Sequence, residues 1–137
     1  MDASKFTTRS QEAINTAIQA AASSGHAQVE AVHLLAALLA QPDSIARPLL
    51  EAAGVAPQTV IAGVEAELKK LPAASGATVS APSYSRATLS ILSRAGDVAG
   101  EMKDDYISTE HLLIAAATVE SPVQQVLTTA GATDEAL

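Results

Sequence analysis

Apolar residues recur at helical spacing in the first part of the chain. They stand three or four positions apart, which places them on one face of a helix: Ala13, Ile14, Ala17, Ile18 and Ala21. Thr7 or Thr8 is a good N-cap for this helix, and Gly25 is a common helix stop. The pattern predicts an amphipathic helix over about residues 8–24.

The segments that follow are separated by proline and glycine residues. Residues 31–41 are apolar nearly all round, so we expect a central, buried helix there. The Pro-Asp-Ser sequence at 42–44 ends it and precedes a short third helix that stops at Gly54. Pro57 opens a fourth helix that reaches Leu71. The first half of the chain is therefore predicted to form four helices.

The second half follows the same order after a turn-rich segment, 72–83, which we expect to link the halves across the surface. Further helices are predicted over residues 86–102, 109–118 and 122–130. An eighth should begin near Thr133, but the sequence stops at Leu137. We therefore expect the last helix to be cut short and the sequence to be part of a longer protein.

The two halves are related in sequence. His33 and His111 set the register, because each is followed by Leu-Leu and they stand 78 residues apart. The same offset pairs Phe6 with Tyr84 and many apolar positions between these markers. Matches spread over so many positions in one register indicate a tandem duplication.

The duplication defines the expected architecture. We predict one domain over residues 1–137, made of repeat one at 6–71, the linker at 72–83 and repeat two at 84–137. Each repeat is a four-helix unit, with the eighth helix truncated, so the fold class is all-α with pseudo-two-fold symmetry and no strands.

Composition sets the kind of core and the kind of partner. Hydrophobic residues make up 48% of the chain and aromatic residues 2%, so Ala, Leu, Ile and Val must form the core. Fifteen acidic residues face eight scattered basic ones, so nucleic acid is not an expected partner. The absence of cysteine excludes disulfide bonds and thiolate metal sites. Neither a membrane span nor a signal peptide is recognisable, so we expect a cytoplasmic protein that does not bind membranes.

The residues that could carry chemistry form no known catalytic pattern. Neither a glycine-rich phosphate loop nor a G-x-S-x-G sequence occurs. His33 and His111 begin apolar helices, where a ring nitrogen can bond nearby backbone, so we expect a structural role for both. A zinc site needs three or four ligands, and the third histidine, His26, is expected in a solvent-exposed loop. The sequence predicts a binding domain with no metal rather than an enzyme.

The repeated pattern resembles the Clp N-terminal domain family of AAA+ chaperones. The resemblance runs from Phe6 to Leu137, and its most specific piece is the sequence YISTEHLL at 106–113, with a partner around the first histidine. Within the family the chain is most similar to the ClpB disaggregases. The ClpC type carries a Thr-Glu pair in both repeats, whereas the first copy here, at 30–33, reads EAVH.

This resemblance implies a function. The chain would be the substrate-recognition domain of a ClpB-like, ATP-dependent disaggregase of the stress response, and it would bind exposed hydrophobic segments of unfolded or aggregated proteins. Co-chaperones or adaptors are further expected partners. The parent is expected to be a homo-hexameric ring that binds ATP beyond Leu137. This domain would hold no cofactor, and the fragment alone would be monomeric.

The resemblance also implies a site. In such domains a threonine that opens the first helix and acids beside the second central helix contact substrate, and they correspond to Thr7, Asp104 and Glu110. They would surround an apolar groove floored by the first helices of the two repeats, with Leu89 and Leu92 exposed in it. A structural explanation stays open, because threonine is a good N-cap and acids at a helix start favour the helix dipole.

Two other functions stay open. One is an adaptor- or degron-docking domain of a ClpC-like protease unfoldase, against which the single Thr-Glu pair, Thr109-Glu110, weighs. The other is a stand-alone Clp-N-like binding protein without an ATPase, against which the missing eighth helix weighs.

Overall fold

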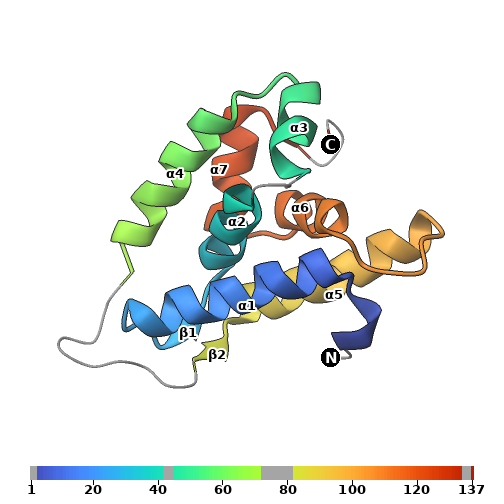
Figure 1. The fold of residues 1–137 in the computed structure, drawn as a ribbon. Coiled ribbons are helices and arrows are strands. Elements are labelled where there is room, and N and C mark those ends of the chain that lie inside the picture. The colour runs from blue at the N-terminus through green and yellow to red at the C-terminus, as the bar shows by residue number, and fades with distance from the viewer. Residues whose placement is uncertain (1–2, 42–44, 72–81, 134–136) are drawn as a thin grey trace.

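The computed structural model describes residues 3–41, 45–71, 82–133 and 137, whose regular secondary structure is almost entirely helical (Figure 1). A short 3-10 helix, η1 (Ala3–Lys5), comes first. The α-helices are α1 (Thr8–Ser23), α2 (Ala31–Ala40), α3 (Ala46–Ala52), α4 (Pro57–Lys69), α5 (Arg86–Glu101), α6 (Thr109–Thr118) and α7 (Pro122–Ala130). The all-α fold class is confirmed. Within this part of the chain, no helix is long and apolar enough to cross a membrane.

Helix lengths repeat at the offset seen in the sequence. α1 and α5 each contain 16 residues, and α2 and α6 each contain 10. In both pairs the second helix begins 78 positions after the first. The predicted helix ends agree with the observed ones to within two residues, because capping, proline and glycine residues mark them. The predicted eighth helix falls mainly on residues 134–136, outside the described residues.

The two longest helices begin with the same kind of cap. Thr7 Oγ1 accepts the Ser10 N–H, and Ser85 Oγ accepts the Thr88 N–H, each at 3.2 Å. A side-chain oxygen that satisfies a free N–H in the first turn stabilises a helix by about 1 kcal/mol. At the other end of the chain, α7 stops at Gly131, whose φ of +96° is a left-handed conformation that glycine adopts without strain.

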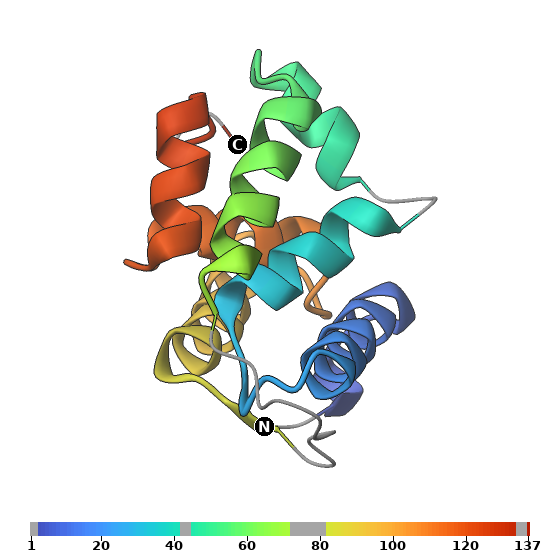
Figure 2. The ribbon, with the colours of Figure 1, turned by 90° about the vertical axis from the view of Figure 1, so that its left-hand side faces the viewer.

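α2 and α6 form the centre of the molecule (Figures 1 and 2). Leu35 and Leu38 of α2 and Leu112 and Leu113 of α6 are at most 1% exposed. α1 packs on α2, α5 packs on α6, and α4 lies against both α2 and α7. In Figure 2, α1 (blue) and α5 (yellow) lie apart on opposite sides of the view. The central helices therefore separate the first helices of the two halves.

Two short parallel pairings join the halves. β1 (Gln28–Val29) pairs with β2 (Ser83–Tyr84), and an isolated bridge joins Phe6 to Ile107. The prediction of no strands was therefore wrong, and Ser83, assigned to the linker, belongs to β2; residues 72–81 of that linker lie outside the described residues. Each pairing involves extended backbone close to a helix start, where N–H and C=O groups need partners. Strands of two residues show no periodicity that a sequence pattern could reveal.

A buried hydroxyl group crosses between the halves beside each pairing. Ser10 Oγ donates to the Ile107 carbonyl at 2.9 Å, and Thr88 Oγ1 donates to the Val29 carbonyl at 2.8 Å. Ser10 and Thr88 are 0% and 1% exposed. Because a buried polar group without a partner is costly, these bonds fix how each half sits on the other.

Each central helix begins with a buried histidine. The Nδ1 atom of His33 accepts the Glu30 N–H, and the Nδ1 atom of His111 accepts the Ser108 N–H, both at 2.8 Å. A nitrogen that accepts a hydrogen bond carries no proton, so each neutral ring holds its proton on Nε2. The two rings therefore close the first turn of their helices in the same way.

The second ring nitrogen has a different partner in each half. His33 Nε2 lies 2.8 Å from Nδ1 of His26, whereas His111 Nε2 lies 2.8 Å from Oδ2 of Asp104. His26 is 8% exposed, so its predicted place in a solvent-exposed loop was wrong. The chain turns inward there because Gly25, with φ +74°, ends α1 and the His26 N–H donates back to that helix at 2.9 Å.

We predict that His33 makes the fold sensitive to mildly acidic pH. Burial, with a smaller contribution from His26, lowers the pKa of His33 to about 4. The unfolded chain takes up this proton near pH 6.5. His33 therefore contributes its full stability above about pH 6.5, and stability falls as pH drops toward 4, by on the order of 3 kcal/mol in total. An NMR titration should find the His33 ring neutral at pH 5. A ring that protonates near pH 6.5 would contradict this.

We also predict opposite effects for two glycine substitutions. A Cβ on Gly63 of α4 would lie 2.6 Å from Val126 Cγ1 on α7, whereas one on Gly100 of α5 would meet nothing within 4 Å. Gly63→Ala should therefore destabilise the fold by about 1–3 kcal/mol through overpacking. Gly100→Ala should stabilise it by up to about 1 kcal/mol. Urea denaturation measures both, and Val126→Ala should reduce the cost of Gly63→Ala. If both substitutions changed the free energy of unfolding by the same amount, the close packing of α4 on α7 would be contradicted.

Candidate functional site

An apolar groove runs along α5. Four of its lining residues follow one face of the helix at positions i, i+3, i+4 and i+7: Leu89, Leu92, Ser93 and Gly96. The other lining residues come from the start of the chain and from the segment before α6: Lys5, Phe6 and Ile107. The volume of the groove is ≈ 380 Å³. Because Phe6 and Ile107 also form the isolated bridge, the groove lies where the two halves meet.

The structure corrects the expected make-up of the groove. Leu89 is 49% exposed and stands at the rim, but Leu92, which was expected to be exposed as well, is 2% exposed and belongs to the core. Among the residues placed around the groove, none comes from α1. The first helices of the two repeats lie apart (Figure 2), so they do not floor it together. Phe6 and Ile107 take the place that α1 was expected to fill.

Large apolar side chains are exposed on α5 and on the loop that follows it. Leu89, Met102 and Tyr106 are 49%, 49% and 58% exposed, and all belong to α5 or to the loop after it. Of these three, Leu89 lines the groove, and exposed apolar surface of this kind marks interaction sites on soluble proteins. The groove on α5 is therefore the leading candidate site.

Thr7 lies next to the groove through its backbone. Its N–H donates to the Ile107 carbonyl at 3.0 Å. Its hydroxyl is engaged at the start of α1, where it accepts the Ser10 N–H at 3.2 Å and donates to Ser10 Oγ at 3.0 Å. The side chain of Thr7 thus acts as a helix cap, and its backbone helps to hold the groove floor in place.

Asp104 and Glu110 both lie close to the Nε2 atom of His111. Asp104 Oδ2 is 2.8 Å from His111 Nε2, and Glu110 Oε1 is 4.0 Å from it, with side-chain exposures of 44% and 40%. Asp104 follows Lys103, whose φ of +60° ends α5, and its N–H donates back to α5 at 2.8 Å. The structure therefore brings both acids to one place. Neither acid is among the residues that line the groove, but each stands three positions from Ile107, which does line it.

The same three residues form the kind of cluster that can hold a metal ion. Ligand atoms of Asp104, Glu110 and His111 lie within 4.8 Å of one another. A metal at His111 Nε2 would require the ring proton on Nδ1, which already accepts the Ser108 N–H. The ring instead directs its Nε2–H to the Asp104 carboxylate. The arrangement favours a hydrogen-bonded cluster over a metal centre.

Sequence reasoning missed Phe6, Ile107 and Gly96 as parts of the groove. A signal for the first two was present in the repeat register. It matches Phe6 with Tyr84 and Ile107 with Val29, so both halves carry large apolar residues at equivalent positions. Gly96 was visible as a glycine inside an otherwise regular helix, which calls for an explanation.

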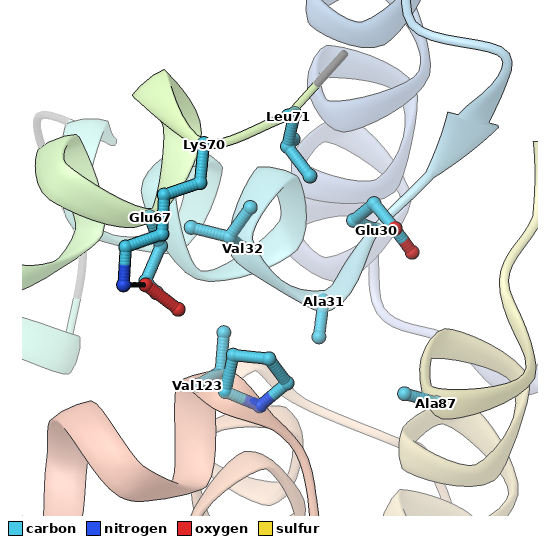
Figure 3. A pocket seen from close by; sticks show the side chains of 9 residues that line it. Glu30, Ala31, Val32, Glu67, Lys70, Leu71, Ala87 and Val123 are labelled. Atoms are coloured by element: carbon cyan, nitrogen blue, oxygen red, sulfur yellow. Dashed lines mark ion pairs between the residues drawn. The ribbon is translucent and has the colours of Figure 1, made fainter.

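A second apolar hollow lies at the starts of α2 and α7 and the end of α4 (Figure 3). Its volume is ≈ 240 Å³, and Ala31, Val32 and Val123 are among its lining residues. Glu67 and Lys70 form an ion pair of 2.7 Å across its wall, drawn as the dashed line in Figure 3. None of the large apolar side chains found exposed in the described residues borders it. The groove on α5 is therefore the better candidate.

Comparison with known proteins places the chain in a family. Residues 5–130 match the Clp repeat (R) N-terminal domain. Over all 137 residues the chain is 44% identical to the chaperone protein ClpB of Mycobacterium tuberculosis. Over 127 residues, 93% of the chain, it is 45% identical to ClpB of Corynebacterium diphtheriae. The chain spans 16% and 15% of the length of these relatives.

Solved structures share the fold. The Hsp104 N-terminal domain from Candida albicans superposes with a TM-score of 0.83 at 23% identity, covering 96% of this chain and 85% of that one. The ClpV N-domain, solved in complex with a VipB peptide, gives a TM-score of 0.76 at 22% identity, covering 96% of this chain and 81% of that one. The chain therefore belongs to the Clp repeat (R) N-terminal domain family and is similar along its whole length to the N-terminal regions of ClpB chaperones.

Proposed function

We propose that this domain recognises substrates for a ClpB-like, ATP-dependent disaggregase by binding exposed hydrophobic segments of unfolded or aggregated proteins. The observation that carries the proposal is the groove on α5, ≈ 380 Å³ in volume, with Leu89 49% exposed at its rim. An unfolded segment gains free energy when its apolar side chains leave water in such a groove. The similarity to ClpB along the whole chain supports this assignment.

The acids at His111, close in sequence to the groove residue Ile107, favour clients that combine apolar and basic residues. Glu110 Oε1 is 4.0 Å from His111 Nε2 and the side chain is 40% exposed, so its carboxylate is accessible to a lysine or arginine of the client. Asp104 is also accessible, but it shares its carboxylate with His111. The net charge of −7 adds a longer-range attraction for basic segments and repels nucleic acid.

A peptide-binding role agrees with a peptide complex of one structural relative. The ClpV N-domain has been solved with a VipB peptide. At 22% identity this likeness extends only to the fold, so it supports the capacity of the fold to hold a peptide, not the identity of the peptide.

In the parent protein, several copies of this domain would bind one client together. A shallow groove and an unfolded client both lose conformational freedom on binding, so a single domain binds weakly. Several copies on one homo-hexameric ring would raise the effective affinity by multivalency. In this proposal ATP is bound and hydrolysed outside residues 1–137, the domain is not catalytic and needs no cofactor, and the protein acts in the cytoplasm.

We predict that removing the apolar rim or the accessible acid weakens client binding without unfolding the domain. Leu89→Ser should weaken binding about five- to tenfold and Glu110→Gln about two- to fivefold, because an apolar side chain that lines the groove contributes more than an exposed charge outside it. The measurement is fluorescence anisotropy of a labelled unstructured peptide that contains Phe, Leu and Arg. Ile45→Ser and Glu120→Gln are matched controls, since both positions are exposed and outside the groove.

The controls decide between the groove and a general surface effect. If Ile45→Ser weakens binding as much as Leu89→Ser, any exposed apolar residue suffices and the groove is not the site. If all four variants bind the peptide as the parent does and remain folded, the proposed function is wrong for this face.

We predict that the two acids differ in their effect on stability. Asp104→Ala removes the acceptor of His111 Nε2–H, in a ring that is 1% exposed, so it should lower the free energy of unfolding by about 1–2 kcal/mol. Asp104→Asn keeps an acceptor oxygen and should recover most of this loss. Glu110→Ala should change stability by less than about 0.5 kcal/mol. Urea denaturation measures all three, and an Asp104→Ala variant as stable as the parent would show that this hydrogen bond contributes nothing.

A further inference from the structure

The groove-lining face of α5 differs from the same face of α1. At the 78-residue offset, Leu89, Leu92, Ser93 and Gly96 of α5 correspond to Gln11, Ile14, Asn15 and Ile18 of α1. The second member of each set is apolar and buried, at 2% and 9% exposure. Two differences stand out at the other positions. At the rim, α5 has Leu89 where α1 has Gln11. One helical turn after Leu92, α5 has Gly96 where α1 has Ile18.

Nothing in the backbone explains the glycine at position 96. Gly96 is not among the glycines with positive φ, and it lies inside α5. A Cβ placed on it would meet only Ile107 Cδ1, at 3.6 Å, which is an ordinary contact. Glycine inside a helix lowers stability relative to alanine. What the glycine provides is space, because the side chain that Ile18 carries at the matching position of α1 is absent from the groove.

We infer that Gly96 keeps open the part of the groove that receives one large apolar side chain of the client, and that it thereby sets a preference for aromatic or large aliphatic residues over small ones. This inference rests on the proposed function. A cavity of about 150 Å³ lined by apolar side chains holds a benzene molecule, and the groove, at ≈ 380 Å³, has room for a larger ring and its neighbours.

The charges around this space specify the client further. The floor beside Gly96 is Ile107, which lies between Asp104 and Glu110 in sequence. Each acid stands three positions from Ile107 and carries a partly exposed carboxylate, which is available to a basic residue of a client segment that extends beyond the groove. The occupant that fits is an aromatic or large aliphatic side chain with a lysine or arginine close to it in sequence.

The test fills the space with a side chain of the domain itself. Gly96→Leu places a leucine in the groove, and Gly96→Ala adds a single methyl group next to Ile107. Gly100→Leu is the matched control, because it makes the same change on the same helix at a position where an added Cβ meets nothing within 4 Å. Both leucine variants remove a glycine from α5, so each should melt no lower than the parent.

Binding is measured with two labelled unstructured peptides, which contain arginine and differ only in carrying Phe or Ala at one position. The parent should prefer the Phe peptide. Gly96→Leu should weaken binding of the Phe peptide about tenfold, equivalent to about 1.4 kcal/mol, and change binding of the Ala peptide little. Gly96→Ala should have an intermediate effect, and Gly100→Leu should bind both peptides as the parent does.

The outcomes separate this inference from the proposed function. If the parent prefers the Phe peptide and Leu89→Ser weakens binding, while Gly96→Leu binds as the parent does, the groove holds clients but Gly96 does not set their size. Equal losses for the two peptides in Gly96→Leu would also overturn the size preference. If the parent binds neither peptide, or Leu89→Ser has no effect, the proposed function itself fails.

Discussion

The carbonyl oxygens of Val29 and Ile107 are the points on which the two halves of the chain are joined. Each accepts a hydrogen bond from a buried hydroxyl of the other half, at 2.8 and 2.9 Å. Each also lies in a short parallel pairing with the other half. Since both residues stand just before a central helix, these bonds orient α2 and α6 and, through them, every helix packed on them. They also bring Phe6 against Ile107, which creates the groove floor.

The matching positions 26 and 104 show how the two halves of one scaffold come to carry different groups. Both follow the residue with positive φ that ends the first helix of the half, and both bond the histidine at the start of the central helix. His26 is buried and pairs with a second ring, which together with burial keeps His33 neutral. Asp104 instead carries a carboxylate on a side chain that is 44% exposed. The same backbone geometry thus gives a buried pair of histidine rings in one half and an accessible carboxylate in the other.

Sequence patterns predicted the helices well and the site only in part. Helix ends were predictable because threonine, proline and glycine act locally, as at Thr7 and Gly131. The burial of His26 was not predictable, because it depends on the turn after α1, which folds this residue inward. Leu89 and Leu92 belong to one apolar stripe, and periodicity does not tell which of them the N-terminal segment covers. The acids were identified by family resemblance, whereas the bond between Asp104 and His111 required coordinates.

The bond between Ser10 and Ile107 spans 97 residues of sequence, and the wall of the groove contributed by Phe6 depends on the same long-range pairing. During synthesis the chain leaves the ribosome from its N-terminus, so Phe6 and Ser10 emerge well before their partners exist. Contacts between such distant residues form late, since a long loop must close first. The groove is therefore absent from the nascent first half, which exposes Phe6 instead. Until its own second half arrives, this chain resembles the unfolded segments that the finished domain is proposed to bind.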